Sequence, residues 1–192
     1  MIKIHKIMTV DNEHLYGPGI RILLFLQGCS IRCKGCINKQ LWKFDGGVSV
    51  SAQEILELVK KENACGITLH GGEPLDQAKG LYDIVELLKG NGLTTILFTG
   101  YQKKELNKEQ IKVWDKSDLV VSGRFVEKKK SFNLQFRGST NQRIITHKGP
   151  YKNYKVYDGF TTAIITVDSK GNMDVNGFLT KDIEKLIGNK NG

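Results

Sequence analysis

Residues 22–36 read ILLFLQGCSIRCKGC, an apolar run followed by three cysteines that are separated by three and then by two residues. The run 22–26 has the length and composition of a buried strand, so the cysteines lie in the loop that follows it. Thiolates are soft ligands that suit zinc or iron–sulfur clusters. Cys29, Cys33 and Cys36 cannot fill all four corners of a cubane cluster, so the pattern predicts a cluster with one iron left open for a substrate.

The spacing alone leaves other roles for these cysteines open. A disulfide is not expected, because the start MIKIHKIMTV has no long apolar segment and no small-residue cleavage site, which predicts a reduced, cytoplasmic protein. A structural zinc site needs a fourth ligand. The sequence offers Cys65, His5, His14, His70 and His147 for it. Inert or redox-active thiols are the remaining alternative.

Length and charge narrow the class of protein. A chain of 192 residues is long enough for one substantial core, and we expect one domain. No apolar stretch approaches the ~18 residues of a membrane-spanning helix. Lys and Arg exceed Asp and Glu by nine (29 against 20), which fits a phosphate-rich ligand, nucleic acid or an acidic protein partner. No nucleic-acid-binding motif accompanies these charges, so we expect neither nucleic acid nor a membrane as partner.

Apolar runs of strand length alternate with segments of helical period. Ser51 and Glu54 form a capping box that opens a helix at 52–61, and further helices are expected over 81–90 and 103–113. Strands are expected at 22–26, which we take as the first, and at 66–69, 93–98 and 118–121. This order is typical of parallel βαβ units. Because a closed eight-unit barrel takes ~250 residues, the predicted fold class is α/β, a partial and open parallel (β/α) barrel.

The periodicity weakens after residue 122. Residues 161–167 and 173–176, joined by the turn 168–171, have the pattern of a hairpin. A short helix is expected at 180–187. We therefore predict a C-terminal extension made of a β-hairpin and a short helix.

Three loops should meet at one edge of the sheet, since the carboxyl ends of parallel strands lie together and ligands bind there. They are the cysteine loop, the segment HGGEP at 70–74 and the segment TGY at 99–101. The two glycines of HGGEP would let a ligand approach the backbone closely. The sequence thus places a ligand site at this edge.

Five segments together resemble a known family. They are YGPGIRILLFLQGCSIRCKGCINKQLW (16–42), ITLHGGEPL (67–75), LFTGY (97–101), SGRF (122–125) and QFRGSTNQR (135–143). In this order they resemble the activating proteins of anaerobic ribonucleotide reductase, a branch of the radical S-adenosylmethionine (SAM) glycyl-radical-enzyme activases. The resemblance implies a single radical SAM domain over 1–192, with a core at about 16–145 and a C-terminal extension at about 146–192.

The resemblance also implies the roles of individual residues. Cys29, Cys33 and Cys36 would bind a [4Fe-4S] cluster. The residues that would contact SAM are Gly35, Cys36 and Ile37 along the cofactor, Gly71, Gly72 and Glu73 at its amino group, and Ser122, Arg124, Asn141 and Gln142 at its ribose or carboxylate. Two positions depart from the family: His70 stands where Ser is frequent, and Ile37 where His or Tyr is frequent.

The activity implied is reductive cleavage of SAM to methionine and a 5′-deoxyadenosyl radical, which takes a hydrogen from a glycine of a partner enzyme. No catalytic side chain beyond the cluster and SAM is required. The implied partners are a glycyl radical enzyme, anaerobic ribonucleotide reductase first, and flavodoxin or ferredoxin as electron donor. Two alternatives stay open: a radical SAM enzyme for a small molecule or peptide, and a non-catalytic zinc or nucleic-acid-binding module.

Overall fold

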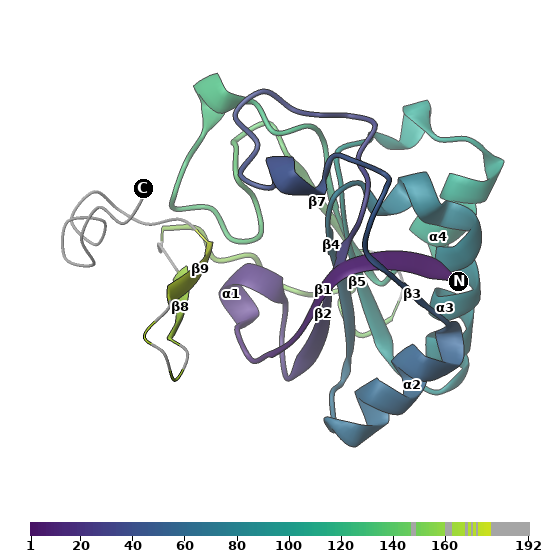
Figure 1. Cartoon of the computed structure of the whole chain (residues 1–192). Coiled ribbons are helices and arrows are strands. Elements are labelled where there is room, and N and C mark those ends of the chain that lie inside the picture. The colour runs from purple at the N-terminus through teal and green to yellow at the C-terminus, as the bar shows by residue number, and fades with distance from the viewer. Residues whose placement is uncertain (147–148, 160–162, 168, 170, 172, 178–192) are drawn as a thin grey trace.

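The computed structural model describes residues 1–146, 149–159, 163–167, 169, 171 and 173–177. It is a mixed α/β protein built on one open, seven-stranded sheet in the order β3-β1-β2-β4-β5-β6-β7. A separate two-stranded sheet, β8-β9, lies to one side (Figure 1). No helix in the described part of the chain is long and apolar enough to span a membrane.

Four parallel strands form the centre of the sheet. They are β2 (Arg21–Leu26), β4 (Gly66–Gly71), β5 (Thr94–Thr99) and β6 (Leu119–Ser122). The connections are α2 (Ala52–Lys61), α3 (Ala78–Gly90) and α4 (Lys108–Lys116), which cover the same face of the sheet (Figure 1). The predicted α/β class and its parallel units are confirmed.

The edges of the sheet are antiparallel. β1 (Ile2–Val10) pairs with β2, β3 (Val48–Val50) pairs with β1, and β7 (Arg143–Thr146) pairs with β6. The prediction that 22–26 is the first strand was therefore wrong. The signal for β1 was present at its start, because the apolar Ile2 and Ile4 are buried while the polar Lys3 and His5, which alternate with them, are exposed, as in a strand with one face on the core.

The predicted start of α2 was correct, because the capping box of Ser51 and Glu54 opens this helix as expected. The helix predicted at 103–113 was placed too early: residues Lys103–Glu105 form a 3-10 turn, and α4 begins only after Asn107. The side chain of Asn107 accepts the Gln110 N–H at 2.9 Å, and the Gln110 side chain accepts the Asn107 N–H at 3.0 Å, so a second capping box starts the helix there.

The C-terminal hairpin is present. β8 (Ala163–Val167) pairs antiparallel with β9 (Met173–Gly177). The helix predicted at 180–187 lies outside the described residues. A short helix near the N-terminus, α1 (Glu13–Tyr16), was not predicted; it is capped by the Asn12 side chain, which accepts the Leu15 N–H at 3.0 Å.

Both faces of the sheet are packed. The main core lies between the sheet and helices α2 to α4, with fully buried side chains such as Leu24, Leu69 and Val85. On the other face, Tyr16 packs with Leu23 and Phe25. A second cluster there joins Ile96 of β5 and two β6 residues to Phe136 and Tyr151, which come from segments after β6. Chain from both ends of the sequence thus covers this face.

Arg21, at the start of β2, is completely buried and makes its hydrogen bonds to neutral groups. Its Nε donates to Thr68 Oγ1 at 2.8 Å, its Nη1 donates to the Tyr151 hydroxyl at 2.9 Å, and its Nη2 donates to the Ile67 carbonyl. Thr94 Oγ1 accepts from Nη1 at 2.9 Å. A buried charge is tolerated when its donors are satisfied, so this guanidinium ties β2, β4, β5 and the Tyr151 segment together.

We expect Arg21→Met to lower the free energy of unfolding by about 3 kcal/mol, because the Ile67 carbonyl and two threonine hydroxyls lose a buried donor. Tyr151→Phe removes the hydroxyl that bonds to Arg21 and Thr94 but leaves the guanidinium in place, and it should cost only about 1–2 kcal/mol. Urea denaturation of the reduced protein without added iron measures both. Equal stability of Arg21→Met and the wild type would show that the network contributes nothing.

Candidate functional site

The cysteine loop leaves β2 and returns to its own starting point. The Gly28 N–H donates to the Leu41 carbonyl at 2.8 Å, and the Cys29 N–H donates to the Trp42 carbonyl at 3.2 Å. The Leu41 side chain is buried and anchors the returning chain. The loop is therefore a closed structure that projects from the carboxyl end of β2.

The loop after β4 is fastened to the base of the cysteine loop. The Gly72 N–H donates to the Leu26 carbonyl and the Glu73 N–H to the Gly28 carbonyl, both at 2.9 Å. A Cβ on Gly72 would lie 2.0 Å from the Gly28 oxygen, and one on Gly71, whose φ is +103°, would lie 2.7 Å from the Leu26 nitrogen. Only glycines allow this approach, so the Gly-Gly pair sets the distance between the two loops.

Glu73 joins the loop after β4 to the end of β5. Its buried carboxylate accepts the Leu75 N–H at 2.9 Å, the Thr99 hydroxyl at 2.7 Å and the Gly100 N–H at 2.8 Å. Burial raises the pKa of Glu73 to about 7, and the hydrogen bonds from Gly100, Leu75 and Thr99 oppose that rise. The side chain thus holds the rim of the site in place.

A second group of polar contacts, which was not predicted from the sequence, fastens the cysteine loop to Asp76 and Tyr101. Asp76 accepts the Ser30 N–H at 2.6 Å and the Ser30 hydroxyl at 2.8 Å. The Tyr101 hydroxyl lies 2.9 Å from Ser30 Oγ and 3.3 Å from Asp76 Oδ1. Ser30 stands directly after the first cysteine, so this group fixes the loop next to Cys29.

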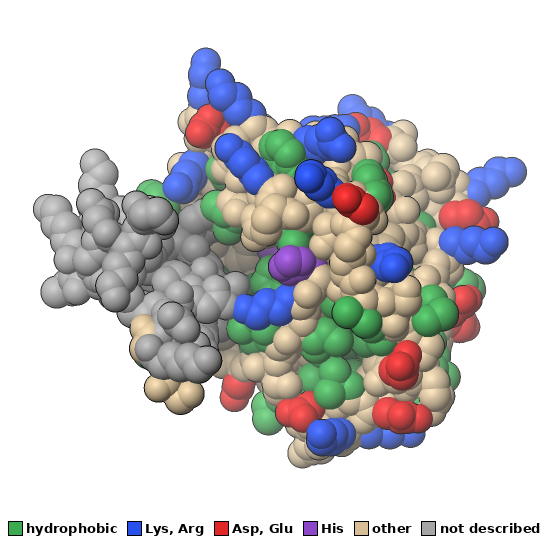
Figure 2. All heavy atoms as spheres, in the orientation of Figure 1, with side chains coloured by type: hydrophobic (Ala, Val, Ile, Leu, Met, Phe, Trp, Pro, Cys, Tyr) green, Lys and Arg blue, Asp and Glu red, His purple; other side chains and the backbone are tan. Residues whose placement is uncertain are grey.

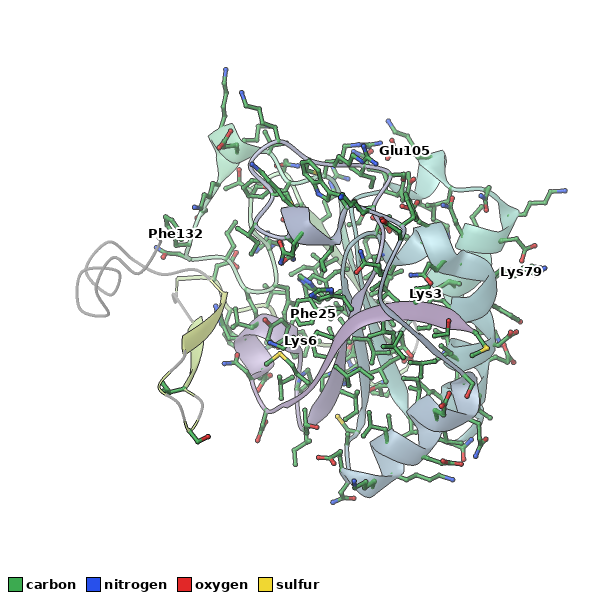
Figure 3. All side chains as sticks on the ribbon, in the orientation of Figure 1. Lys3, Lys6, Phe25, Lys79, Glu105 and Phe132 are labelled. Carbon is green, nitrogen blue, oxygen red and sulfur yellow. The ribbon has the colours of Figure 1, made fainter. Side chains whose placement is uncertain are left out.

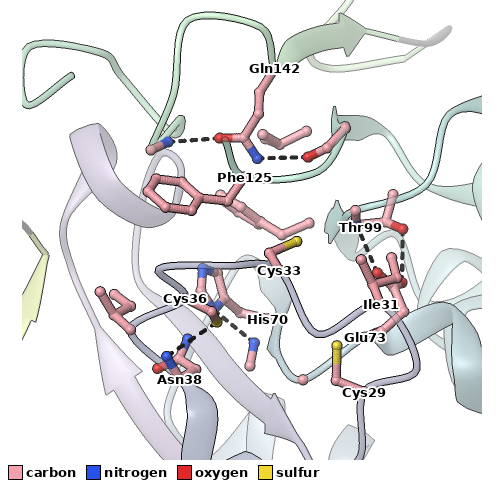
Figure 4. A pocket seen from close by; sticks show the side chains of 18 of the residues that line it. Cys29, Ile31, Cys33, Cys36, Asn38, His70, Glu73, Thr99, Phe125 and Gln142 are labelled. Carbon is pink, nitrogen blue, oxygen red and sulfur yellow. Dashed lines mark hydrogen bonds between the residues drawn. The ribbon is translucent and has the colours of Figure 1, made fainter. Parts of the chain in front are cut away.

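These loops enclose a pocket of about 210 Å³ (Figure 4). Its walls include all three cysteines of the loop. Of the other predicted cofactor contacts, it is lined by Gly35, Ile37, Gly71, Gly72, Glu73 and Gln142. The structure therefore brings together predicted residues that are as far apart in the sequence as Cys29 and Gln142.

Three predicted contacts are not among the residues that line this pocket. Ser122 donates to the Tyr101 carbonyl at 2.9 Å, and Arg124 forms an ion pair with Glu105 at 2.6 Å. Asn141 donates to the Arg124 carbonyl at 2.9 Å and, with Ser122, lines a neighbouring cavity. Their roles toward a cofactor stay predictions.

Gln142 does line the pocket, but its side-chain amide is engaged with the backbone. Its Oε1 accepts the Gly138 and Ser139 N–H groups at 2.8 and 3.2 Å, and its Nε2 donates to the Gly123 carbonyl at 2.9 Å (Figure 4). In this arrangement the amide connects the segment after β6 with the segment before β7. Gln142 thereby shapes the wall of the pocket.

The aromatic wall of the pocket was not predicted from the sequence. Tyr16, Phe98, Phe125 and Phe136 line it, and they come from three separate parts of the chain. Tyr16 ends α1, Phe98 lies in β5, and Phe125 and Phe136 lie between β6 and β7. Because each aromatic residue stands alone in the sequence, no local pattern links them, and the wall forms only when the sheet assembles.

His70 belongs to the same wall. Its ring centroid lies 5.5 Å from that of Phe25, 4.8 Å from that of Phe98 and 6.1 Å from that of Tyr16. The Gly71 N–H donates to His70 Nδ1 at 2.7 Å, which assigns the ring hydrogen to Nε2 (Figure 4). Burial lowers the pKa of His70 to about 4, so the imidazole is neutral at pH 7.

The donor set fits an iron–sulfur cluster. All four cysteines are free, and Cys29, Cys33 and Cys36 line one pocket. Burial raises the pKa of the Cys29 and Cys33 thiols, so both are protonated at pH 7 without a metal. In the described part of the chain no three His, Cys, Asp or Glu side chains converge on a single ion. A cubane cluster does not require such convergence, because each thiolate binds a different iron.

Comparisons with known proteins agree with this donor set. The family described as "4Fe-4S single cluster domain" matches residues 15–145. The anaerobic ribonucleoside-triphosphate reductase-activating protein of Escherichia coli (strain K12) is 35% identical over 150 residues, which cover 73% of this chain and 96% of that protein. The pyruvate formate-lyase-activating enzyme of Clostridium pasteurianum is 39% identical over 108 residues, 53% of this chain and 44% of that enzyme. The crystal structure of QueE from Escherichia coli superposes on 52% of each chain with a TM-score of 0.45 and 22% identity.

Gly72→Ala should separate the two loops, because its Cβ would meet the Gly28 carbonyl, a backbone atom, at 2.0 Å. We expect a loss of about 3 kcal/mol in the free energy of unfolding. Gly90→Ala is the matched control, because nothing lies within 4 Å of a Cβ at the end of α3. Urea denaturation compares the two variants. If Gly72→Ala is as stable as Gly90→Ala, the contact between the loops does not constrain the fold.

The neutral His70 should make stability depend on pH. Between pH 6.5 and about 4 the unfolded chain binds a proton that the folded chain does not, so stability decreases as the pH falls through this window. His70→Phe removes this term, and we expect its loss of stability from pH 7 to pH 4 to be smaller than that of the wild type by up to about 3 kcal/mol. Urea titrations at several pH values measure the difference. Parallel pH profiles would contradict the buried neutral imidazole.

Proposed function

Because this chain belongs to the 4Fe-4S single cluster domain family and to the anaerobic ribonucleoside-triphosphate reductase-activating proteins, we propose that it generates the glycyl radical of an anaerobic ribonucleoside-triphosphate reductase. It is a radical SAM enzyme that uses a [4Fe-4S] cluster and SAM. The observation that supports this function best is the pocket in which Cys29, Cys33 and Cys36 face the Gly71-Gly72 loop. A thiolate triad and a ligand-binding rim in one pocket are what the reaction requires.

Cys29, Cys33 and Cys36 would hold the cluster, which when bound and reduced would supply the electron for the cleavage of SAM that leads to hydrogen abstraction from the partner's glycine. The cysteines must release their protons to bind iron. Since burial raises the pKa of Cys29 and Cys33, cluster loading should be favoured by higher pH. Phe98 and Phe136 give the pocket an apolar wall, which suits a reactive radical.

We also propose that SAM lies along Gly35, Cys36 and Ile37, with its amino group at the Gly71–Glu73 segment. The carboxylate of Glu73 already accepts three hydrogen bonds from the protein. The backbone of this segment is therefore the partner that we propose for the ammonium, and Glu73 acts as the residue that fixes the backbone. Contacts from Ser122, Arg124, Asn141 and Gln142 to the ribose or carboxylate are part of the same proposal.

The partner is a glycyl radical enzyme. Activating enzymes of pyruvate formate-lyase match this chain over less than half of their own length, whereas the reductase-activating protein of Escherichia coli matches over 96%. This difference favours the reductase. We further propose a reduced flavodoxin or ferredoxin as electron donor, a cytoplasmic location for the protein with its free thiols, and a sheet curved as a partial barrel around the pocket.

The activity can be tested with the iron- and sulfide-reconstituted protein under anaerobic conditions. With dithionite and SAM, the wild type should form 5′-deoxyadenosine, and Cys33→Ala should form none while its circular dichroism spectrum is unchanged. Cys65→Ala is the control, because Cys65 lies before β4, at the opposite end of that strand from the pocket. With the reductase added, electron paramagnetic resonance should detect a glycyl radical only for the wild type and Cys65→Ala.

Product from Cys33→Ala, or its absence from a wild type that carries a full cluster, would refute the assignment. A colourless protein with one tightly bound zinc after anaerobic purification would instead favour the non-catalytic zinc module.

A further inference from the structure

The outer surface of the cysteine loop is strongly basic. Residues 31–44 contain four cationic residues and no Asp or Glu, and all four are exposed: Arg32, Lys34, Lys39 and Lys43. Within the described part of the chain none of the four forms an ion pair. Figure 2 shows Lys and Arg side chains gathered over the end of the molecule formed by this loop and by residues 124–130. The protein therefore presents uncompensated positive charge directly outside the thiolates.

The same surface also exposes a large apolar side chain. Phe44, directly after Lys43, is 54% exposed. Ile37 is 60% exposed as well, at the edge of the pocket that it lines. Apolar side chains surrounded by charged ones are typical of protein–protein interfaces, whereas a phosphate backbone is bound by cations and polar groups. The surface thus has the character of a docking site for an acidic protein.

An electron has to enter the molecule near this surface. Three of the four cysteines line the pocket, and the fourth, Cys65, precedes β4 at the far end of the sheet. Its thiol donates to the Pro18 and Ile20 carbonyls at 3.2 Å, away from the pocket. Cys65 is therefore not placed to relay electrons to the thiolates, and the outer face of the cysteine loop is the direct route.

We infer that this face, formed by Arg32, Lys34, Lys39, Lys43 and Phe44, docks an acidic electron-transfer protein; the inference rests on the proposed radical SAM function. The donor loses one electron and the cluster gains it, with no bond formed and no proton transferred. The aromatic side of the pocket stays free for the glycine of the partner enzyme. Two acidic residues border the face: Asp45 follows Phe44, and Glu127 lies against Gly35.

Charge complementarity of this kind acts mainly on the rate of encounter and is screened by salt. Docking of the donor should therefore weaken as ionic strength rises. Reduction by a small inorganic reductant needs no docking surface. Comparing the reaction driven by the protein donor with the reaction driven by the inorganic reductant therefore separates an effect on docking from an effect on the cluster.

The test uses the cluster-loaded protein with Lys39→Glu/Lys43→Glu, two positions outside the cysteine triad. Lys79→Glu/Lys108→Glu is the charge-matched control, with both residues exposed in the first turns of α3 and α4. Figure 3 shows Lys79 on the helical layer, pointing away from the body of the molecule. The probe is an acidic flavodoxin, whose Kd is measured by calorimetry at two salt concentrations. The yield of 5′-deoxyadenosine is measured with photoreduced flavodoxin and, separately, with dithionite.

We expect Lys39→Glu/Lys43→Glu to weaken flavodoxin binding and to slow the flavodoxin-driven reaction about tenfold or more, while iron content and the dithionite-driven reaction match those of the control. Unchanged flavodoxin binding would overturn the inference. So would a loss of glycyl radical on the reductase with dithionite as reductant, which would assign the face to the reductase. Loss of binding to a duplex oligonucleotide with no effect on flavodoxin would assign it to nucleic acid. A wild type that forms no product even with dithionite would instead refute the proposed function.

Discussion

The site depends on one close backbone contact, the approach of the loop after β4 to the base of the cysteine loop. Gly72 donates to the Leu26 carbonyl at 2.9 Å, and there is no room for a Cβ between Gly72 and the Gly28 oxygen. Because the two loops share a backbone contact, neither can move without the other. Every other feature of the pocket, from the position of the thiols to that of Glu73, is built outward from this contact.

Above that contact, the polar groups of the site are mostly engaged with the protein itself. Glu73 and Asp76 each accept three hydrogen bonds, and both serve to hold loops rather than to offer free charge. His70 is neutral and enclosed by aromatic rings. The protein therefore contributes a pocket whose polar groups are held by the protein itself, which suits chemistry that a cluster and a bound cofactor perform. The positive charge lies outside the pocket, on the surface of the cysteine loop.

Prediction from the sequence succeeded where the signal was local. The capping box at Ser51, the apolar run at 22–26 and the turn-flanked hairpin at 163–177 are each encoded within a few residues, and the structure has them all. It failed for β1, because a strand with one exposed face carries a weaker pattern than the unbroken apolar run of β2. It also placed the start of α4 too early, because the second capping box at Asn107 was not recognised.

The sequence by itself determined the family and the loops that meet at one edge, because five motifs in a fixed order and the alternation of strand and helix patterns are encoded in short segments. Only the tertiary structure decided that Glu73 is a tether, that Gln142 holds two segments together and that His70 sits among aromatic rings. These roles depend on partners far away in the chain, such as Thr99 for Glu73 and Gly123 for Gln142. Contacts of that kind arise when strands align, and no pattern within a short segment specifies them.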